Sequence, residues 1–127
     1  GYKEHSFIQK FIYRYHMFAY PSTWEETSCN AALEAMAAGL YCIVTNYGAL
    51  YETCSEYPLY VTYEKDTKRL AAKFAAAIRE AIQTLDSHEV FEHLQEQQKF
   101  VKKFYSWEKR KVDWTNFLQG VLHERKN

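Results

Sequence analysis

The sequence lacks a net charge and lacks any long apolar run. Sixteen Lys and Arg residues balance sixteen Asp and Glu residues in the 127-residue chain. A dedicated nucleic-acid-binding protein is usually strongly basic, so this balance argues against that class. No apolar run approaches the length of a membrane span, and Gly1 opens no signal-peptide pattern. We therefore expect a globular protein with no strong membrane or nucleic-acid signal.

Cysteine, glycine and proline are also scarce. The three cysteines, Cys29, Cys42 and Cys54, are odd in number and have no Cys-x-x-Cys spacing. This usage predicts a reducing, cytoplasmic compartment, with a peripheral membrane location left open. No repeat and no linker rich in Pro, Gly or Ser divides the chain, and its 47% hydrophobic residues suffice for one core. We expect one domain or part of one, with an α/β portion at residues 1–64 and a helical tail at residues 65–127.

Signatures of metal and cofactor chemistry are missing as well. The sequence contains neither His-Glu-x-x-His nor Asp-x-Asp, and His88 and His93 are five positions apart, which does not place them on one helix face. A pyridoxal-phosphate enzyme needs a lysine beside its site, and the nearest lysine after residues 20–39 is Lys65. We therefore predict no bound metal and no cofactor.

Lysine and arginine are absent from residues 15–64, a stretch that carries six glutamates. A diphosphate bound there needs positive charge, and one helix N-terminus supplies only about half a unit charge. Either another segment supplies the cations or this stretch binds no phosphate.

The central feature of the sequence is residues 20–39, YPSTWEETSCNAALEAMAAG. A short apolar strand, Met17–Tyr20, leads to a proline that cannot extend a central strand. We predict that an alanine-rich helix begins near Thr27 or Ser28 and ends at Gly39, which supplies a left-handed stop. The first N–H groups of that helix have no internal partners and face the carboxyl end of the strand. In open α/β sheets, ligands bind at this edge.

Strands and helices alternate in the pattern that follows. The run Tyr41–Thr45 is continuously apolar, as in a parallel strand buried on both faces, and Leu59–Thr62 gives a third strand. A short helix at Ala49–Thr53 lies between them, and the chain is helical after residue 64. The pattern predicts an α/β fold with a parallel sheet of about three strands, right-handed crossovers, flanking helices and a C-terminal helical tail.

Cap residues and apolar spacing locate the expected helices. A first helix over residues 7–14 is expected to pack on the sheet, and Glu89 is placed for a capping box to Asp86. The expected caps are, in chain order, Ser6, Asp66 or Thr67, Asp86 or Ser87, and Ser106. The expected inward faces of the last three helices are Leu70, Phe74, Ala77, Ile78, Ala81, Ile82 and Leu85; then Val90, Phe91, Leu94, Val101, Phe104 and Tyr105; then Trp107, Trp114, Phe117, Leu118 and Val121.

The central stretch resembles a known family. Its PS-x-x-E-E and LEAMAAG segments are similar to the donor-site motif of the retaining GT-B glycosyltransferases often called glycosyl transferases group 1, in which two glutamates are separated by seven residues. Glu26 and Glu34 have that spacing. The likeness continues in the family's order over nearly the whole chain, from Gly1 to the late YSWEKRKVDWTNFL helix. It implies a three-layer, Rossmann-like, C-terminal donor-nucleotide-binding domain.

The resemblance also implies what is missing. In the family, an acceptor-binding domain and earlier strand–helix units precede this region, and those units supply the Arg and Lys that hold the donor diphosphate. The alignment places Gly1 just after a middle strand. It therefore implies a part-domain without its first strand–helix units, whose partners include the missing N-terminal domain and strands of the parent chain. An open sheet edge of this kind also invites self-association.

The resemblance assigns roles to the two glutamates. Glu26, the candidate catalytic residue, would contact the donor sugar and stabilise positive charge at the anomeric carbon. Glu34 would accept hydrogen bonds from the ribose hydroxyls of the nucleotide sugar. On the residues alone, each is equally well an ordinary carboxylate at a helix start or on a helix surface. The two are roughly 12 Å apart along a helix, which suits a long ligand better than a single bond.

Further binding residues follow from the same resemblance. Where the family commonly has glycines close to the sugar and phosphate, this chain has Thr27, Ser28, Cys29 and Asn30. Their side chains occupy space that glycine leaves open, although Thr27 and Ser28 still offer backbone and hydroxyl donors. Cys29 has no histidine near it in sequence, so a buried structural role is favoured over a nucleophilic one. Thr45, Asn46, Gly48 and Glu52 match the neighbouring loop and helix of the family, and a turn and a surface helix explain them equally well.

Two functions from different classes remain open. The first is the donor-binding part of a glycosyltransferase that moves a sugar, with retention, from a nucleotide-diphosphate sugar to an unidentified acceptor hydroxyl; the longer parent is then the enzyme, and the isolated chain has little turnover. The second is a non-catalytic module derived from such a lobe, which binds a partner through the helical tail or an open sheet edge. The basic and aromatic residues 99–111 could form a patch for anionic lipid or nucleic acid, but we expect the basic residues to be the solvated side of helices, with the aromatic rings in the core.

Overall fold

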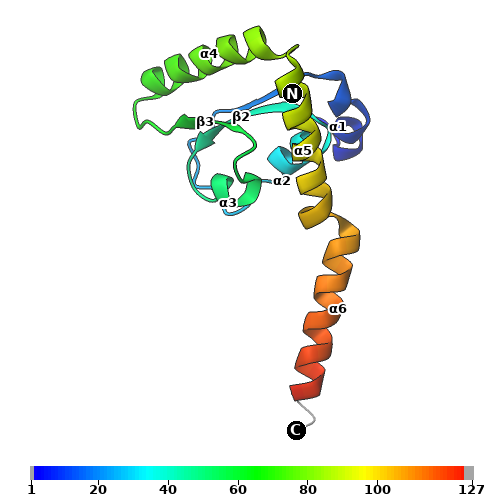
Figure 1. The fold of residues 1–127 in the computed structure, drawn as a ribbon. Helices are drawn as coiled ribbons and strands as arrows, with labels where there is room; N and C mark the ends of the chain where they lie inside the picture. The colour runs from blue at the N-terminus through cyan, green and yellow to red at the C-terminus, as the bar shows by residue number, and fades with distance from the viewer. Residues whose placement is uncertain (1, 125–127) are drawn as a thin grey trace.

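A parallel three-stranded sheet forms the centre of the protein (Figure 1). The structure is a computed structural model and describes residues 2–124. The strands are β1 (Met17–Tyr20), β2 (Tyr41–Asn46) and β3 (Leu59–Thr62), in the spatial order β1-β2-β3. Within the described residues, β1 and β3 are therefore the edge strands. The sheet confirms the three predicted strands and the predicted α/β class.

Helices cover both faces of this sheet, in agreement with the predicted layers. The helix α4 lies over one face, and α2, α3 and α5 lie on the other, while α6 extends away from the body (Figure 1). A short 3₁₀ helix, Ile12–Arg14, joins α1 to the chain before β1. None of the described helices is long and apolar enough to cross a membrane. The helices are α1 (His5–Phe11), α2 (Asn30–Ala37), α3 (Leu50–Cys54), α4 (Thr67–Thr84), α5 (His88–Tyr105) and α6 (Trp107–Glu124).

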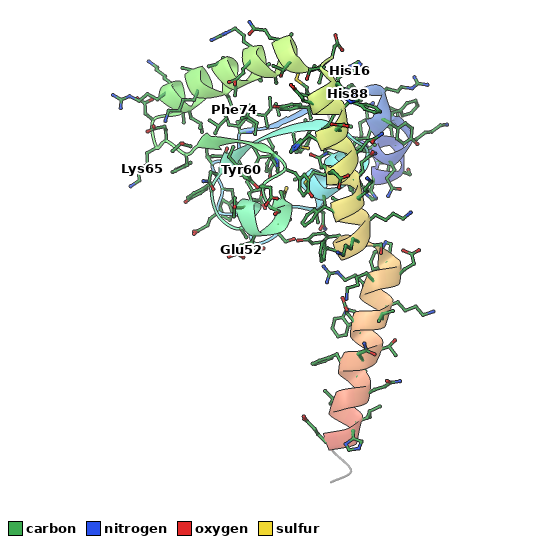
Figure 2. All side chains as sticks on the ribbon, in the orientation of Figure 1. His16, Glu52, Tyr60, Lys65, Phe74 and His88 are labelled. Carbon is green, nitrogen blue, oxygen red and sulfur yellow. The ribbon has the colours of Figure 1, made fainter. Side chains whose placement is uncertain are left out.

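The strand β2 is buried on both faces, as its continuous apolar run predicts. Cys42 and Val44 pack in a core with α2, α3 and α5, whereas Ile43 packs in a second core with α4. Phe74 points from α4 toward the sheet in that second core (Figure 2). The alternation of side chains along one strand therefore joins the two layers of helices.

The end of α2 is held by two glutamines of α5. Gly39 has φ +81°, the left-handed conformation that was predicted to stop the helix. Gln97 is fully buried, and its Nε2 donates to the carbonyls of Met36 and Leu40 at 3.1 and 3.0 Å. Gln98 donates to the carbonyl of Ala37 at 3.0 Å. These amides attach α5 to the last turn of α2 and to the residue that leads into β2.

The predicted start of α1 is wrong, and so is the predicted capping box of α5, although Ser87 is one of the two caps expected there. Glu4, not Ser6, is the N-cap of α1, and its side chain makes no capping bond. Ser87 caps α5 by accepting from the N–H of Val90, so the expected box between Asp86 and Glu89 does not form. Asp66 and Ser106 are at the predicted places: each side chain accepts backbone N–H groups of the helix that follows. Serine and aspartate both suit these positions, so local composition alone does not choose between neighbours.

The predicted inward face of α6 is wrong. This helix has no buried residue, and the side chains of Trp107, Trp114 and Phe117 are 86%, 61% and 61% exposed. Helical spacing identifies which residues share a face, but it does not determine whether another element lies against that face. Three further residues that were expected in the core of α4 and α5 are exposed for the same reason: Ile82, Phe91 and Phe104.

Candidate functional site

The carboxyl ends of β1 and β2 carry the two loops in which the candidate residues cluster. Because the strands are parallel and adjacent, the loop after β1 (residues 21–29) and the loop after β2 (residues 47–49) leave the same edge of the sheet. Ligands bind at this edge in open α/β sheets. The structure therefore puts both loops where the sequence predicts a site.

The first loop begins with a compact turn around Ser22. Ser22 is buried, and its Oγ accepts from the N–H of Trp24 at 3.2 Å and donates to the carbonyl of Trp24 at 3.1 Å. Both polar groups of this backbone are thereby satisfied locally. The indole of Trp24 is left 76% exposed beside the candidate carboxylates.

The backbone of Glu26 is fixed by the second loop. The N–H of Ala49 donates to the carbonyl of Glu26 at 2.7 Å. Gly48 has φ +59°, and a Cβ built on it would lie 2.5 Å from the nitrogen of Glu26 and 2.7 Å from its carbonyl oxygen. Only glycine combines this conformation with so close an approach. Gly48 therefore joins the two loops.

The side chain of Glu26 is fixed by Tyr20, the last residue of β1. The Tyr20 hydroxyl donates a short hydrogen bond to Oε1 of Glu26. This bond, together with burial, raises the pKa of Tyr20 to about 12, so the phenol keeps its proton at neutral pH. The adjacent Glu25 is exposed, and its side chain has no hydrogen-bond or ion-pair partner in the described part of the chain. Of the two neighbouring carboxylates, Glu26 is the one that the fold orients.

The helix α2 begins at Asn30, later than the predicted start near Thr27 or Ser28. Glu26 is attached to Tyr20 and to Ala49, and the chain remains a non-helical loop as far as Cys29, which is extended with φ −113° and ψ 93°. Thr27 and Ser28 are exposed loop residues as a result. Cys29 is buried, and burial raises the pKa of its thiol, which disfavours the nucleophilic thiolate.

Thr45 and Asn46 end β2 below these loops. Thr45 is fully buried, and its Oγ1 donates to the carbonyl of Tyr20 at 3.4 Å, so it supports the junction of the two strands instead of facing a ligand. Asn46 is exposed at the edge itself. Beside it, the rings of Tyr47 and Tyr63 stack with centroids 4.1 Å apart.

Glu34 lies in a different place, on the side of α2 that faces α1. His5 Nε2 lies 2.6 Å from its Oε1, and both side chains are partly exposed. Glu34 lines a cavity of about 420 Å³ together with Lys3, Phe7 and Phe11. This cavity separates α1 from β1 and α2, so the predicted packing of the first helix on the sheet is loose. The cavity combines a cation, a carboxylate and aromatic rings.

Glu52 is not brought to the Glu26 loop. It lies on the outer side of α3 (Figure 2) and lines a second cavity, of about 580 Å³, with Tyr105, Lys109 and Arg110. The nine candidate residues therefore fall into three places. Within residues 2–124, no three His, Cys, Asp or Glu side chains are grouped as a metal site requires.

Comparison with family models decides the relationship. The model of the family described as Glycosyl transferases group 1 matches residues 1–84, about two thirds of the chain. The chain belongs to this family. Its chemistry is therefore of the glycosyl-transfer kind, and its Rossmann-like α/β sheet agrees with that membership. Comparison with curated proteins and with solved structures found no match.

Two residues of this candidate site were missed by reasoning from the sequence. Tyr20 was identified only as the end of a strand, and Ala49 only as the start of a helix. Both act through tertiary contacts with Glu26. A hydroxyl at a strand end close in sequence to a carboxylate is the signal that could have indicated Tyr20.

Proposed function

We propose that Glu26 and the loops around it form the donor-sugar site of a retaining glycosyltransferase that uses a nucleotide-diphosphate sugar. One observation carries the proposal: in a chain of the glycosyl transferases group 1 family, Glu26 is fixed in both backbone and side chain at the carboxyl edge of the sheet. Preorganised charge at the reacting centre is a major source of catalysis.

The proposed reaction moves the sugar to an unidentified acceptor hydroxyl. The nucleotide diphosphate departs from the face of the sugar that the acceptor enters, and positive charge develops at the anomeric carbon. The Glu26 carboxylate hydrogen-bonds sugar hydroxyls and stabilises that charge. Thr27 and Ser28, exposed beside it, supply hydroxyl and backbone donors to the sugar. Little side-chain proton transfer is required.

The nucleotide half of the donor is assigned to the cavity beside Glu34. Glu34 accepts from the ribose hydroxyls, and the rings of Phe7 and Phe11 offer surfaces for the base. Lys3 lines the same cavity and brings positive charge from outside the cation-free stretch 15–64. His5 already contacts the Glu34 carboxylate, so it shares or yields that carboxylate when the ribose binds.

The direct experiment is calorimetric titration of the protein with UDP, GDP and ADP, followed by their common sugar conjugates. We expect Glu34→Ala to weaken nucleotide binding about tenfold or more, because hydrogen bonds to a charged acceptor are lost. Glu92→Ala is the matched control, since Glu92 forms a similar exposed pair with His88 at 3.3 Å on α5. If no nucleotide binds to the complete natural protein containing these residues, the proposal is wrong.

The same proposal places the protein in the cytoplasm. Cys29, Cys42 and Cys54 are all buried and unpaired, which suits a reducing compartment. The proposal requires two partners, the nucleotide-sugar donor and the unidentified acceptor, and no bound metal is needed to explain the roles given above.

A non-catalytic interaction module is the second candidate, and α6 is the observation that favours it. This helix exposes a set of large apolar side chains and projects from the body (Figure 1). Exposed apolar faces commonly mark contact surfaces. Sedimentation of the chain over a range of concentrations tests self-association, and Leu118→Lys should abolish it if α6 is the surface. If the chain is monomeric and binds a nucleotide sugar, only the first function, glycosyl transfer, remains supported.

A further inference from the structure

Tyr20 occupies a position that neither the strand nor the core explains fully. It ends β1, stacks on Phe18 with ring centroids 5.6 Å apart, and packs against the edge of the core beside α2. These apolar contacts need only a phenylalanine. The hydroxyl is additional, and it is directed to the Glu26 carboxylate.

The two restraints on Glu26 are independent. Its backbone is fixed by Gly48 and Ala49 from the loop after β2. Those contacts do not determine the torsions of the side chain, which is only partly buried. In the described part of the chain, the Tyr20 hydroxyl is the hydrogen-bond partner of the carboxylate. Removing that hydroxyl would leave the loop in place and the carboxylate without orientation.

We propose that Tyr20 is a positioning residue of the donor site: its hydroxyl holds Oε1 of Glu26, so that the other carboxylate oxygen is presented to the donor sugar. This inference rests on the proposed function of Glu26 as the group that contacts the sugar. It goes further by naming the residue through which the fold sets the direction of that carboxylate.

A phenol suits this role chemically. A tyrosine keeps its proton at neutral pH, and the hydrogen bond to Glu26, together with burial, raises the pKa of Tyr20 further, to about 12, so the group acts as a neutral donor to Glu26. A neutral donor also leaves the negative charge on Glu26. Lysine or arginine in the same place would form an ion pair and oppose the charge that has to face the anomeric carbon. The Tyr20 hydroxyl therefore orients the Glu26 carboxylate without neutralising its negative charge.

The test is Tyr20→Phe in the complete natural protein, with Tyr60→Phe as the control. Tyr60 belongs to β3 (Figure 2), and its hydroxyl donates to the backbone carbonyls of Leu50 and Ser55 and not to Glu26. The probes are UDP-glucose, GDP-mannose and ADP-glucose, with release of the nucleoside diphosphate as the readout. We expect Tyr20→Phe to lower kcat about tenfold while the Kd of the free nucleoside diphosphate changes less than twofold. Tyr60→Phe should leave kcat unchanged and lower only Tm.

A spectroscopic measurement keeps the inference testable without turnover. In protein labelled with ¹³Cζ-tyrosine, Tyr20→Phe identifies the Tyr20 resonance at pH 7. Glu26→Gln should move that resonance toward those of tyrosines in water, because an amide oxygen is a weaker acceptor than a carboxylate. A resonance that does not move would contradict the contact and overturn the inference.

The possible results distinguish a failure of the proposed function from a failure of the positioning role of Tyr20. If the wild-type protein neither binds nor turns over any of the three donors, the proposed function fails, and this inference fails with it. If the wild-type protein turns over a donor and Tyr20→Phe has the same kcat, only the positioning role of Tyr20 is overturned. A fall in kcat with an equal loss of nucleotide affinity would also overturn it, since that result indicates a general disruption of the fold.

Discussion

Gly48 lies so close to Glu26 that a Cβ built on Gly48 would be 2.5 Å from the backbone nitrogen of Glu26. The two residues come from loops that follow adjacent strands, and the hydrogen bond from Ala49 to the Glu26 carbonyl closes the same junction. The position of the candidate catalytic carboxylate therefore depends on a residue with no side chain. Several consequences can be measured.

Gly48→Ala should destabilise the protein and displace the loop that carries Glu26. Its φ of +59° is unfavourable for alanine, and the new methyl group would overlap the Glu26 backbone. We expect the free energy of unfolding to fall by about 1–3 kcal/mol, and donor binding to be lost. Gly120→Ala is the control: an added Cβ there meets nothing within 4 Å, and helix propensity should raise stability by about 0.5–1 kcal/mol. Urea unfolding of the two variants measures this difference in the free energy of unfolding. If both variants are equally stable, the close approach of Gly48 to Glu26 is contradicted.

Gln97→Ala should destabilise the junction of α5 with α2. The buried amide donates to the carbonyls of Met36, in α2, and of Leu40, just before β2, and alanine would leave them with fewer partners as well as a void. We predict a loss of about 1–3 kcal/mol. Gln95 is exposed on the same helix, so Gln95→Ala should change the free energy of unfolding by less than about 0.5 kcal/mol. If Gln97→Ala leaves the free energy of unfolding unchanged, the two hydrogen bonds make no net contribution to stability.

Stability should fall as the pH rises above about 9. Burial raises the pKa of Cys42 and of Cys54 from 9.0 to about 12, so the folded protein keeps protons that the unfolded chain releases. The unfolded state then binds fewer protons, and stability is lost between pH 9 and pH 12, with Tyr20 adding to the loss above pH 10.

The check on this alkaline loss is urea unfolding at pH 8, 9.5 and 10.5. A Cys42→Ala/Cys54→Ala variant is less stable at every pH but should show a shallower decline, because two of the titrating groups are gone. Parallel curves for the variant and the wild-type protein would show that the thiols do not cause the loss.

Trp114→Ala and Phe74→Ala should have very different effects, although both residues lie on predicted apolar faces. Trp114 is 61% exposed on α6, and its removal should change the free energy of unfolding by less than about 0.5 kcal/mol. Phe74 is 4% exposed in the core between α4 and the sheet, and its removal should cost about 3–5 kcal/mol. A large loss from Trp114→Ala would show that α6 packs against a partner in solution.

The strands and most helix boundaries could be predicted because their signals are local. A continuous apolar run predicts β2, and Gly39 predicts the end of α2. The three parallel strands follow from their separation by helices. The family relationship was likewise carried by a contiguous stretch, residues 20–39, and the match over residues 1–84 confirms it.

The features that could not be predicted depend on contacts between distant residues. Gln97 reads as a polar interruption in the apolar face of α5, and only the position of the α2 end explains its burial. The late start of α2 accompanies the attachment of Glu26 to Tyr20 and to Ala49, which are contacts outside the helix. The spacing of Glu26 and Glu34 suggested one continuous helix between them, whereas a loop extends as far as Cys29. For α6, the spacing of the apolar residues correctly indicated that they share one face of the helix, but it could not show whether another element packs against that face.

The central claim is that Glu26, not its neighbour Glu25, contacts the donor sugar. The most direct measurement compares Glu26→Gln with Glu25→Gln in the complete natural protein, using release of nucleoside diphosphate from UDP-glucose, GDP-mannose and ADP-glucose. The account predicts that Glu26→Gln lowers kcat by about a hundredfold or more while the nucleoside diphosphate still binds, and that Glu25→Gln keeps activity within about twofold of wild type. Equal activities of the two variants, or a greater loss from Glu25→Gln, would contradict the account.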